Sequence, residues 1–324
     1  MKVQLNDGSI KEFENAENMF VIAKSISNSL AKKSVAAKVD GELKDMSYVL
    51  DRDAKVEFIT ADSEEGEHII RHSAAHLMAQ AVVRLFPGTK VTIGPAIENG
   101  FYYDFDSEEQ FTPEDLEKIE AEMKKIVKED IKIERLEMSR EDAIKHFEAL
   151  GEIYKVEIIK EIAQGEMLSF YKQGDFMDLC RGPHVPATSY IKAFKLKSVA
   201  GAYWRGDSNN KMLQRIYGLA FSDDKRLKDY LKFLEEAEKR DHRRLGKELE
   251  LFFVSEYGPG FPFFMPKGMV LKNTLMEKRT QKSRICWNSN SYNIKQRTLG
   301  KFRTLVQLQR KYVYYFNRWN RFCY

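Results

Sequence analysis

The sequence predicts an α+β protein built from several successive domains. The chain has 324 residues, enough for two or three domains of ordinary size. Runs of helical hydrophobic periodicity alternate with short strand-like runs, and Asp-Gly turns separate some of the strands. No run of about 18 apolar residues occurs, and the N-terminus has no signal-like pattern, so we expect a cytoplasmic protein with no membrane partner.

Residues 1–61 predict a small β-grasp domain. MKVQL and IKEFE flank an Asp7-Gly8 step that suits a hairpin, and Asp40-Gly41 marks a second hairpin. Between the hairpins, apolar residues recur at helical spacing at Met19, Ile22, Ala23, Ile26 and Leu30. Strands around one helix in such a short span are typical of the ubiquitin-like β-grasp. The acidic segment 61–67 is expected to be a linker.

Residues 62–224 predict a larger α+β domain. HIIRHSAAHLMAQAVVRLF reads as a helix that ends before Pro87, and Thr112 and Ser139 are expected to cap two more helices. Strands are expected at VEII, MLSFY and LQRIYGLAF. The charged stretch 225–250 predicts one long linker helix. The aromatic stretch 251–277 looks like the start of a further folded unit.

Two pairs of residues suit metal binding or proton transfer. His72 and His76 are four residues apart on a predicted helix, so they share one face. Cys180 and His184 flank a Gly-Pro step that forces a turn. Each pair alone can arise by chance, but four such groups in one domain favour a joint site. That site could be tetrahedral zinc or a polar pocket that orients a water molecule. The three cysteines do not form a disulfide framework.

Four motifs in order carry a resemblance to a known family: HSAAHLMAQAV, GPAIENGFYYDF, GDFMDLCRGPHV and GAYWRGDSNNKMLQRIYG. They are similar to the editing domain of bacterial threonyl-tRNA synthetases. Residues 1–61 resemble the TGS domain of that family, and residues 251–277 resemble the start of its class II catalytic domain, which is built on an antiparallel sheet. The resemblance implies a homodimeric parent enzyme that joins threonine to tRNA(Thr) with ATP, Mg²⁺ and Zn²⁺.

The resemblance also implies roles for individual residues. Six are expected to act in hydrolysis of mischarged seryl-tRNA(Thr): His72, His76, Lys155, Asp178, Cys180 and His184. Three more are expected to bind substrate or tRNA: Tyr103, Arg181 and Arg205. The resemblance favours editing without a cofactor, while zinc held by the two histidine and cysteine pairs stays open.

The last 47 residues depart from the family. Residues 278–324 contain 12 Lys and Arg and no Asp or Glu, whereas the first 277 residues contain 41 basic and 49 acidic residues. A nucleic-acid-binding arm is one interpretation. Back-translating the tail with permitted codons and shifting the frame by one base gives a string that resembles the family's first catalytic motif. We therefore expect an out-of-frame, poorly folded tail, no synthetic-site zinc ligands, and no aminoacylation by this chain.

Two other functions compete with this interpretation. One is a free-standing deacylase that clears mischarged tRNA in trans, although the linker helix and the segment after it disfavour a protein of that kind. The other is a non-catalytic RNA-binding protein that uses the TGS-like domain. The paired histidine and cysteine residues favour a hydrolase.

Overall fold

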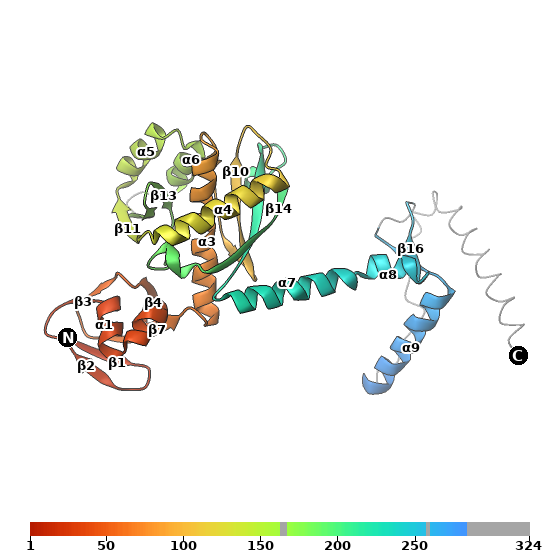
Figure 1. Cartoon of the computed structure of the whole chain (residues 1–324), viewed down its shortest axis with the longest axis horizontal. Helices are drawn as coiled ribbons and strands as arrows, with labels where there is room; N and C mark the ends of the chain where they lie inside the picture. Colours follow the sequence, from red (N-terminus) through yellow and green to blue (C-terminus); the bar gives the residue numbers. More distant parts are fainter. Residues whose placement is uncertain (163–166, 257–259, 284–324) are drawn as a thin grey trace, which may run out of the picture. The chain divides into compact units, whose positions relative to one another are not determined.

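The computed structural model describes residues 1–162, 167–256 and 260–283. The chain divides into two compact units, Met1–Leu231 and Lys232–Tyr324. The first unit contains both domains that the sequence predicts ahead of the linker (Figure 1). The α+β class is confirmed.

The N-terminal domain is a β-grasp, as predicted. Its five-stranded sheet has the order β2-β1-β7-β4-β5, with β1 and β7 parallel and the other pairs antiparallel. Both Asp40 and Gly41 have positive φ, which explains why an Asp-Gly step forms this hairpin. The elements are β1 (Lys2–Leu5), β2 (Ile10–Glu12), β3 (Glu17–Asn18), α1 (Met19–Ile26), α2 (Asn28–Lys33), β4 (Ser34–Val39), β5 (Glu42–Asp45), β6 (Val49–Leu50) and β7 (Ala54–Thr60).

Strand β4 joins this domain to the next one. Ala37 and Val39 lie in the core of the β-grasp, whereas Val35 and Ala36 belong to the larger core of the second domain. The strand is buried on both faces because helix α3 (Glu64–Leu85) packs against its outer side. The β-grasp is therefore fixed to the second domain by a shared apolar core.

The second domain surrounds α3, which links it to the β-grasp (Figure 1). An antiparallel sheet with the order β14-β15-β10-β8 lies beside a three-stranded sheet, β11-β12-β13. The remaining elements are β8 (Lys90–Val91), β9 (Ala96–Ile97), β10 (Gly100–Asp106), α4 (Pro113–Glu129), β11 (Ile133–Met138), α5 (Arg140–Ala149), α6 (Ile153–Glu161), β12 (Leu168–Gln173), β13 (Phe176–Leu179), β14 (Ala193–Tyr203) and β15 (Met212–Phe221), with short 3-10 turns at Thr188–Tyr190 and Trp204–Gly206.

The predicted helix caps are confirmed. The Thr112 side chain accepts from the Asp115 backbone in a full capping box, and Ser139 accepts from the Asp142 backbone. The helix expected before Pro87 ends at Leu85. Strands are confirmed at 168–173 and 212–221.

Two local predictions are wrong. VEII, expected as a strand, lies in helix α6, where Val156 and Ile159 are buried three residues apart. Four apolar residues do not distinguish a strand from a helical turn. The expected linker 61–67 is already helical from Glu64, because Ser63 caps α3 by accepting from the Gly66 backbone.

The single linker helix predicted over 225–250 is instead two helices, α7 (Asp224–Lys239) and α8 (His242–Glu248). The side chain of Asp241 accepts from the Arg243 backbone, so it caps a new helix and ends the old one. Within the second unit, α8 is followed by β16 (Phe252–Val254), β17 (Pro262–Phe264) and α9 (Pro266–Ser283). Residues 278–283 of the basic tail lie in α9, and residues 284–324 lie outside the described part of the chain.

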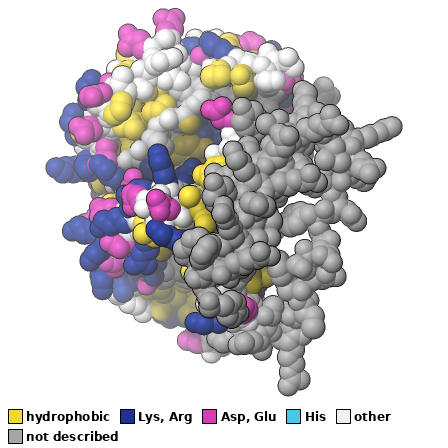
Figure 2. Space-filling model, turned by 90° about the vertical axis from the view of Figure 1, so that its right-hand side faces the viewer, with side chains coloured by type: hydrophobic (Ala, Val, Ile, Leu, Met, Phe, Trp, Pro, Cys, Tyr) yellow, Lys and Arg dark blue, Asp and Glu magenta, His cyan; other side chains and the backbone are white. Residues whose placement is uncertain are grey.

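Charged residues of both signs cover the described surface. Figure 2 shows Lys and Arg side chains interspersed with Asp and Glu on one face, with hydrophobic atoms between them. Among the described helices, none combines the length and the apolar character that crossing a bilayer requires.

Candidate functional site

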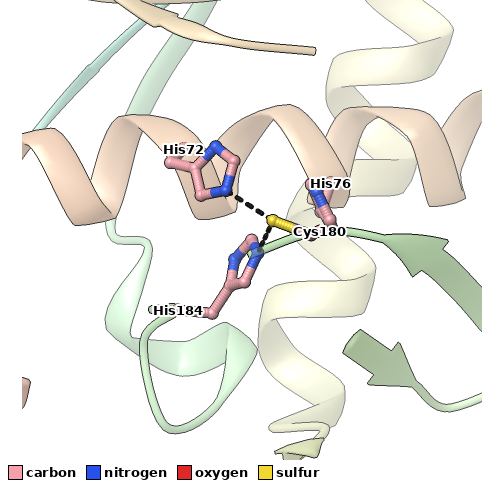
Figure 3. Close-up of side chains that lie close together, drawn as sticks. All are labelled: His72, His76, Cys180 and His184. Atoms are coloured by element: carbon pink, nitrogen blue, oxygen red, sulfur yellow. Dashed lines mark hydrogen bonds between the residues drawn. The ribbon is translucent and has the colours of Figure 1, made fainter. Parts of the chain in front are cut away.

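Four side chains from two distant segments converge in the second domain (Figure 3). Helix α3 supplies His72 and His76, and the turn after β13 supplies Cys180 and His184. One ring nitrogen from each histidine and the cysteine sulfur all lie within 4.8 Å of one another. The Cys180 sulfur is 2.8 Å from His72 Nε2 and 3.2 Å from His184 Nε2. The two pairs therefore lie together, as a joint site requires. The catalytic roles of these residues stay predictions.

A fifth residue, Ser73, extends the cluster. Its hydroxyl lies 3.0 Å from His184 Nδ1 and accepts a 3.1 Å hydrogen bond from the Val185 backbone. One assignment of hydrogens satisfies every contact: Ser73 donates to His184 Nδ1, His184 Nε2–H donates to the Cys180 sulfur, and the thiol donates to His72. This chain of hydrogen bonds orders the imidazoles without any ionised group.

Burial keeps the cluster neutral. Desolvation lowers the pKa of His72 to about 3 and the pKa of His76 to about 4, and it holds the pKa of His184 well below the ordinary value. Repulsion from neighbouring imidazoles adds to the shifts at His72 and His184. Burial also raises the pKa of the Cys180 thiol to about 12. At neutral pH the cluster therefore presents neutral imidazoles and a protonated thiol, which is a poor nucleophile.

Charge is concentrated beside His76. Lys155, from α6, forms an ion pair with Asp178, from β13, and donates hydrogen bonds to the Thr92 carbonyl at 2.7 Å and the Tyr103 hydroxyl at 3.1 Å. Tyr103 in turn donates to Asp178 at 2.5 Å, and His76 Nε2 is 3.6 Å from the same carboxylate. Lys155, Asp178 and Tyr103 are all buried.

The neighbours of Asp178 decide its charge. Burial opposes ionisation, but the Lys155 ammonium and the hydrogen bonds from Lys155 and Tyr103 hold the pKa of Asp178 below its ordinary value. Burial and the nearby carboxylate raise the pKa of Tyr103 well above its ordinary value. The site therefore holds a buried ion pair with a neutral phenol bridging it.

The turn that carries Cys180 and His184 depends on its glycine. Gly182 has a φ of +71°, and a Cβ placed there would lie 1.8 Å from the Tyr171 hydroxyl oxygen. Glycine alone allows the loop to pass this close to Tyr171. The sequence signal Gly-Pro predicted the turn correctly, but it gave no sign of Tyr171 or of Asp45, to which Tyr171 donates at 2.7 Å.

A cavity of about 430 Å³ opens beside the cluster. This volume is in the range of small-molecule sites, about 300–1,000 Å³. The cavity wall comes from β5, α3 and the 180–183 turn, through Leu43, Glu65, His68, Ile69, His72, Cys180, Arg181, Gly182 and Pro183. His72 and Cys180 thus connect the cluster to a space that can hold a ligand, and Arg181 is an exposed cation at its edge.

Arg205 is placed differently from the other predicted residues. It lies at the tip of the β14–β15 hairpin, on the face of Trp204, and pairs with Glu157 at 3.0 Å and with Glu161 at 2.5 Å. It does not line the cavity described above. The structure brings Tyr103 and Arg181 to the site and leaves Arg205 among acidic partners.

The donor set resembles a zinc site in its chemistry, with three imidazoles and one thiol. In tetrahedral zinc sites, with bonds of about 2.1 Å to nitrogen and 2.3 Å to sulfur, a nitrogen and a sulfur ligand lie about 3.6 Å apart. The 2.8 Å and 3.2 Å contacts of Cys180 are shorter and are those of hydrogen bonds. The residues are right in kind for zinc, but their spacing fits a hydrogen-bonded polar cluster.

Comparison with known proteins gives two domain matches. Residues 1–60 match the TGS domain, and residues 168–217 match the threonyl and alanyl tRNA synthetase second additional domain. The second match includes Asp178, Cys180 and His184.

Similar full-length proteins are threonine–tRNA ligases. The one from Fusobacterium nucleatum subsp. nucleatum is 71% identical over 260 residues, which is 80% of this chain and 42% of the relative. The one from Clostridioides difficile is 58% identical over 277 residues, or 86% and 43%, and the one from Carboxydothermus hydrogenoformans is 56% identical over 285 residues, or 88% and 45%. The chain therefore spans less than half the length of these relatives.

Proposed function

Because the chain belongs to the threonyl-tRNA synthetase family and carries its TGS and second additional domains, we propose that residues 62–224 hydrolyse mischarged seryl-tRNA(Thr). One observation carries the proposal. Three neutral imidazoles and a thiol form one cluster whose His72 and Cys180 line a cavity, and a buried lysine–aspartate pair lies next to His76.

The proposed reaction is attack of water on the seryl ester. A water molecule in the cavity takes the place of the Cys180 thiol at His72 Nε2 and donates a hydrogen bond to this neutral imidazole, which orients a lone pair of the water toward the ester carbonyl. His184 acts indirectly, because its hydrogen bond to the sulfur holds Cys180 in place. As the bond from the water oxygen to the carbonyl carbon forms, the imidazole accepts a proton from the water. The tetrahedral intermediate then breaks its bond from carbon to the ribose oxygen, and the proton passes to that oxygen, so that serine and a free ribose hydroxyl leave. The terminal ribose is an alternative group to assist the water. Lys155 offsets the negative charge that develops on the carbonyl oxygen.

The remaining groups bind and orient the substrate. Asp178 and Tyr103 present a carboxylate and a hydroxyl next to His76, where they can hold the amino acid or the terminal adenosine. Arg181 stands at the cavity edge, where a phosphate of the tRNA end would gain a bidentate contact. We also propose a tRNA contact for Arg205, at the hairpin tip.

Selectivity for serine follows from the same pocket. Serine lacks one methyl group of threonine, and such a group is worth only about 1–3 kcal/mol of discrimination in one site. A second site that admits serine and rejects threonine by steric clash multiplies this discrimination. The substrate class proposed is therefore a tRNA that carries the smaller amino acid in error.

Serine release from seryl-tRNA(Thr) tests the proposal. His72→Ala and His184→Ala should lower the rate by about 10²–10⁴-fold, the range for loss of a proton-handling side chain. His146→Ala is the matched control, because His146 is exposed on α5 and should leave the rate unchanged. Full hydrolysis by both site variants would defeat the assignment, and it would favour a non-catalytic RNA-binding role.

We propose that hydrolysis needs no metal. The hydrogen-bonded spacing of the cluster supports this, and neutral imidazoles can orient water without an ion. Treatment with a chelator should leave the rate unchanged. A loss that is restored by Zn²⁺ would instead assign a metal to His72, His76, Cys180 and His184.

The wider activity is proposed only for a longer protein. Threonine ligation, with its ATP, Mg²⁺ and Zn²⁺, tRNA(Thr) and homodimer, is proposed for an intact enzyme of this family. For the basic tail after Glu277 we propose a shifted reading frame, since its composition departs so sharply from the first 277 residues. The coding DNA around Met276 would show the shift or its absence.

A further inference from the structure

We propose that Asp45, in the β-grasp domain, is a positioning residue for the hydrolytic site of the second domain. It holds the turn that carries Cys180 and His184 in place, although Asp45 is not itself one of the residues that line the cavity. The effect on hydrolysis rests on the function proposed above, while the effect on His184 does not.

The Asp45 carboxylate binds the turn at two points. One oxygen accepts a 3.0 Å hydrogen bond from the backbone N–H of His184, and the other accepts a 2.7 Å bond from the Tyr171 hydroxyl. These partners are 139 and 126 residues away in sequence. A single carboxylate therefore fixes both the backbone of a site residue and the aromatic ring beside it.

The Tyr171 ring transmits this restraint to the site. Its centroid is 4.4 Å from that of His184, and its hydroxyl lies against Gly182. The nitrogens of the His184 ring contact the cluster: Nε2 lies 3.2 Å from the Cys180 sulfur, and Nδ1 lies 3.0 Å from the Ser73 hydroxyl. A shift of the His184 backbone would disturb both hydrogen bonds, so the position set by Asp45 bears directly on the cluster.

Asp45 is itself held on a rigid frame. It ends strand β5 and pairs with Ala36 of β4. Ala36 is fully buried in the core that β4 shares with α3, the helix that carries His72 and His76. The β-grasp sheet therefore connects the helix that supplies one half of the cluster to the turn that supplies the other half. Groups held in this way by surrounding packing give a site its precision.

The test compares three variants of the full chain. Asp45→Leu removes both acceptors, while Asp45→Asn can still accept from His184 N–H and donate to the Tyr171 oxygen. Lys38→Met is the matched control. Lys38 also joins the β-grasp to the second domain, through a 2.6 Å ion pair with Glu65 of the cavity wall, and its ion pair does not involve the 180–184 turn. The readouts are kcat and KM for serine release from seryl-tRNA(Thr), and the ¹⁵N and ¹H resonances of the His184 imidazole.

Asp45→Leu should lower kcat on the order of tenfold, because the buried His184 N–H loses its acceptor, and should shift the His184 resonances with little change in KM. Asp45→Asn should restore most of kcat. Lys38→Met should leave kcat and the His184 resonances unchanged, with any change confined to KM because its partner Glu65 lines the cavity. A His184 imidazole with unchanged resonances in Asp45→Leu would overturn the proposal. So would an equal loss of kcat in Lys38→Met, since the effect would then belong to the domain contact as a whole.

Two further results distinguish the positioning role of Asp45 from a folding defect and from a failure of the proposed hydrolysis. If Asp45→Leu does not fold, Tyr171→Phe decides, because it deletes one of the two bonds; unchanged His184 resonances in that variant would overturn the proposal. If His72→Ala hydrolyses normally, the proposed function fails, yet the His184 resonances still report whether Asp45 positions the turn.

Discussion

The two sides of the polar cluster are held together by different forces. His72, Cys180 and His184 form a neutral side, linked by hydrogen bonds and kept uncharged by burial. Lys155 and Asp178 form a charged side, a buried ion pair bridged by a phenol. The neutral side can orient a water molecule but has no thiolate to attack with. The charged side has a fixed ammonium that can offset charge on an oxyanion. We therefore assign the positioning of water to the neutral side and the electrostatic stabilisation of the oxyanion to the charged side.

Removing one member of the charged side should have the largest effect. In Lys155→Met, Asp178 is left as an unpaired carboxylate in a buried site, which costs about 3–5 kcal/mol when one partner of a buried pair is removed. Urea unfolding followed by circular dichroism measures this loss. We also expect serine release to fall, because no ammonium faces the developing oxyanion.

The double variant Lys155→Met/Asp178→Leu separates the two losses. It removes the unpaired charge, so much of the free energy of unfolding should return, whereas hydrolysis should stay low. Recovery of hydrolysis together with stability would mean that the charged side serves only to hold the fold.

Two buried histidines of the cluster should make the protein sensitive to mild acid. His72 and His76 have pKa values of about 3 and about 4 in the folded chain, against an ordinary value of 6.5. Below pH 6.5 the unfolded state therefore binds protons that the folded state does not bind. Each such histidine lowers the free energy of unfolding by about 1.4 kcal/mol per pH unit as the pH falls toward 4. The stabilisation is fully present above pH 6.5.

Urea unfolding at pH 7, 6 and 5 measures this dependence, and His72→Gln is the comparison. The variant should take up about one proton fewer on unfolding, so the slope of its unfolding free energy against pH should be smaller. An identical slope in both proteins would mean that His72 is protonated in the folded state and that the neutral side is misassigned.

The Cys180 thiol should react slowly, since burial raises its pKa to about 12. In a background with Cys286→Ser and Cys323→Ser, iodoacetamide should modify Cys180 at a rate that still rises above pH 9. Cys180→Ser keeps a hydroxyl between the two imidazoles, so hydrolysis should fall by less than about tenfold. A reaction rate that levels off near pH 7 would reveal a thiolate, and Cys180 would then not belong to a neutral side.

The smallest effects are expected at the two arginines outside the cluster. Arg205→Gln breaks surface pairs with Glu157 and Glu161 and should change the free energy of unfolding by no more than about 1 kcal/mol. Arg181→Gln should raise KM for seryl-tRNA(Thr) more than Arg205→Gln, because Arg181 lines the cavity and Arg205 already has acidic partners. The reverse order of KM values would move the tRNA contact to the hairpin tip.

Local chemistry made much of the site predictable. The i, i+4 spacing of His72 and His76 fixes them on one helix face, and the Gly-Pro step bends the chain between Cys180 and His184. Both signals act within a few residues. Four such groups in one domain favoured a joint site before any family was considered. The place of Lys155, Asp178 and Tyr103 beside them came from the family resemblance, since no spacing rule relates residues so far apart.

No sequence pattern pointed to Asp45, Tyr171 or the buried state of the cluster. Asp45 is one of many acidic residues, and its partners lie more than a hundred residues away, so only the folded sheet brings them together. The pKa shifts likewise depend on packing around α3. The same limit explains VEII, because its helical state depends on which side chains the rest of the domain buries.

The most direct test of the central claim compares serine and threonine release under single-turnover conditions. We expect the chain to free serine from seryl-tRNA(Thr) at least about tenfold faster than threonine from threonyl-tRNA(Thr), and His184→Ala to remove the difference. Equal rates for the two esters, or an undiminished preference for serine in His184→Ala, would contradict it.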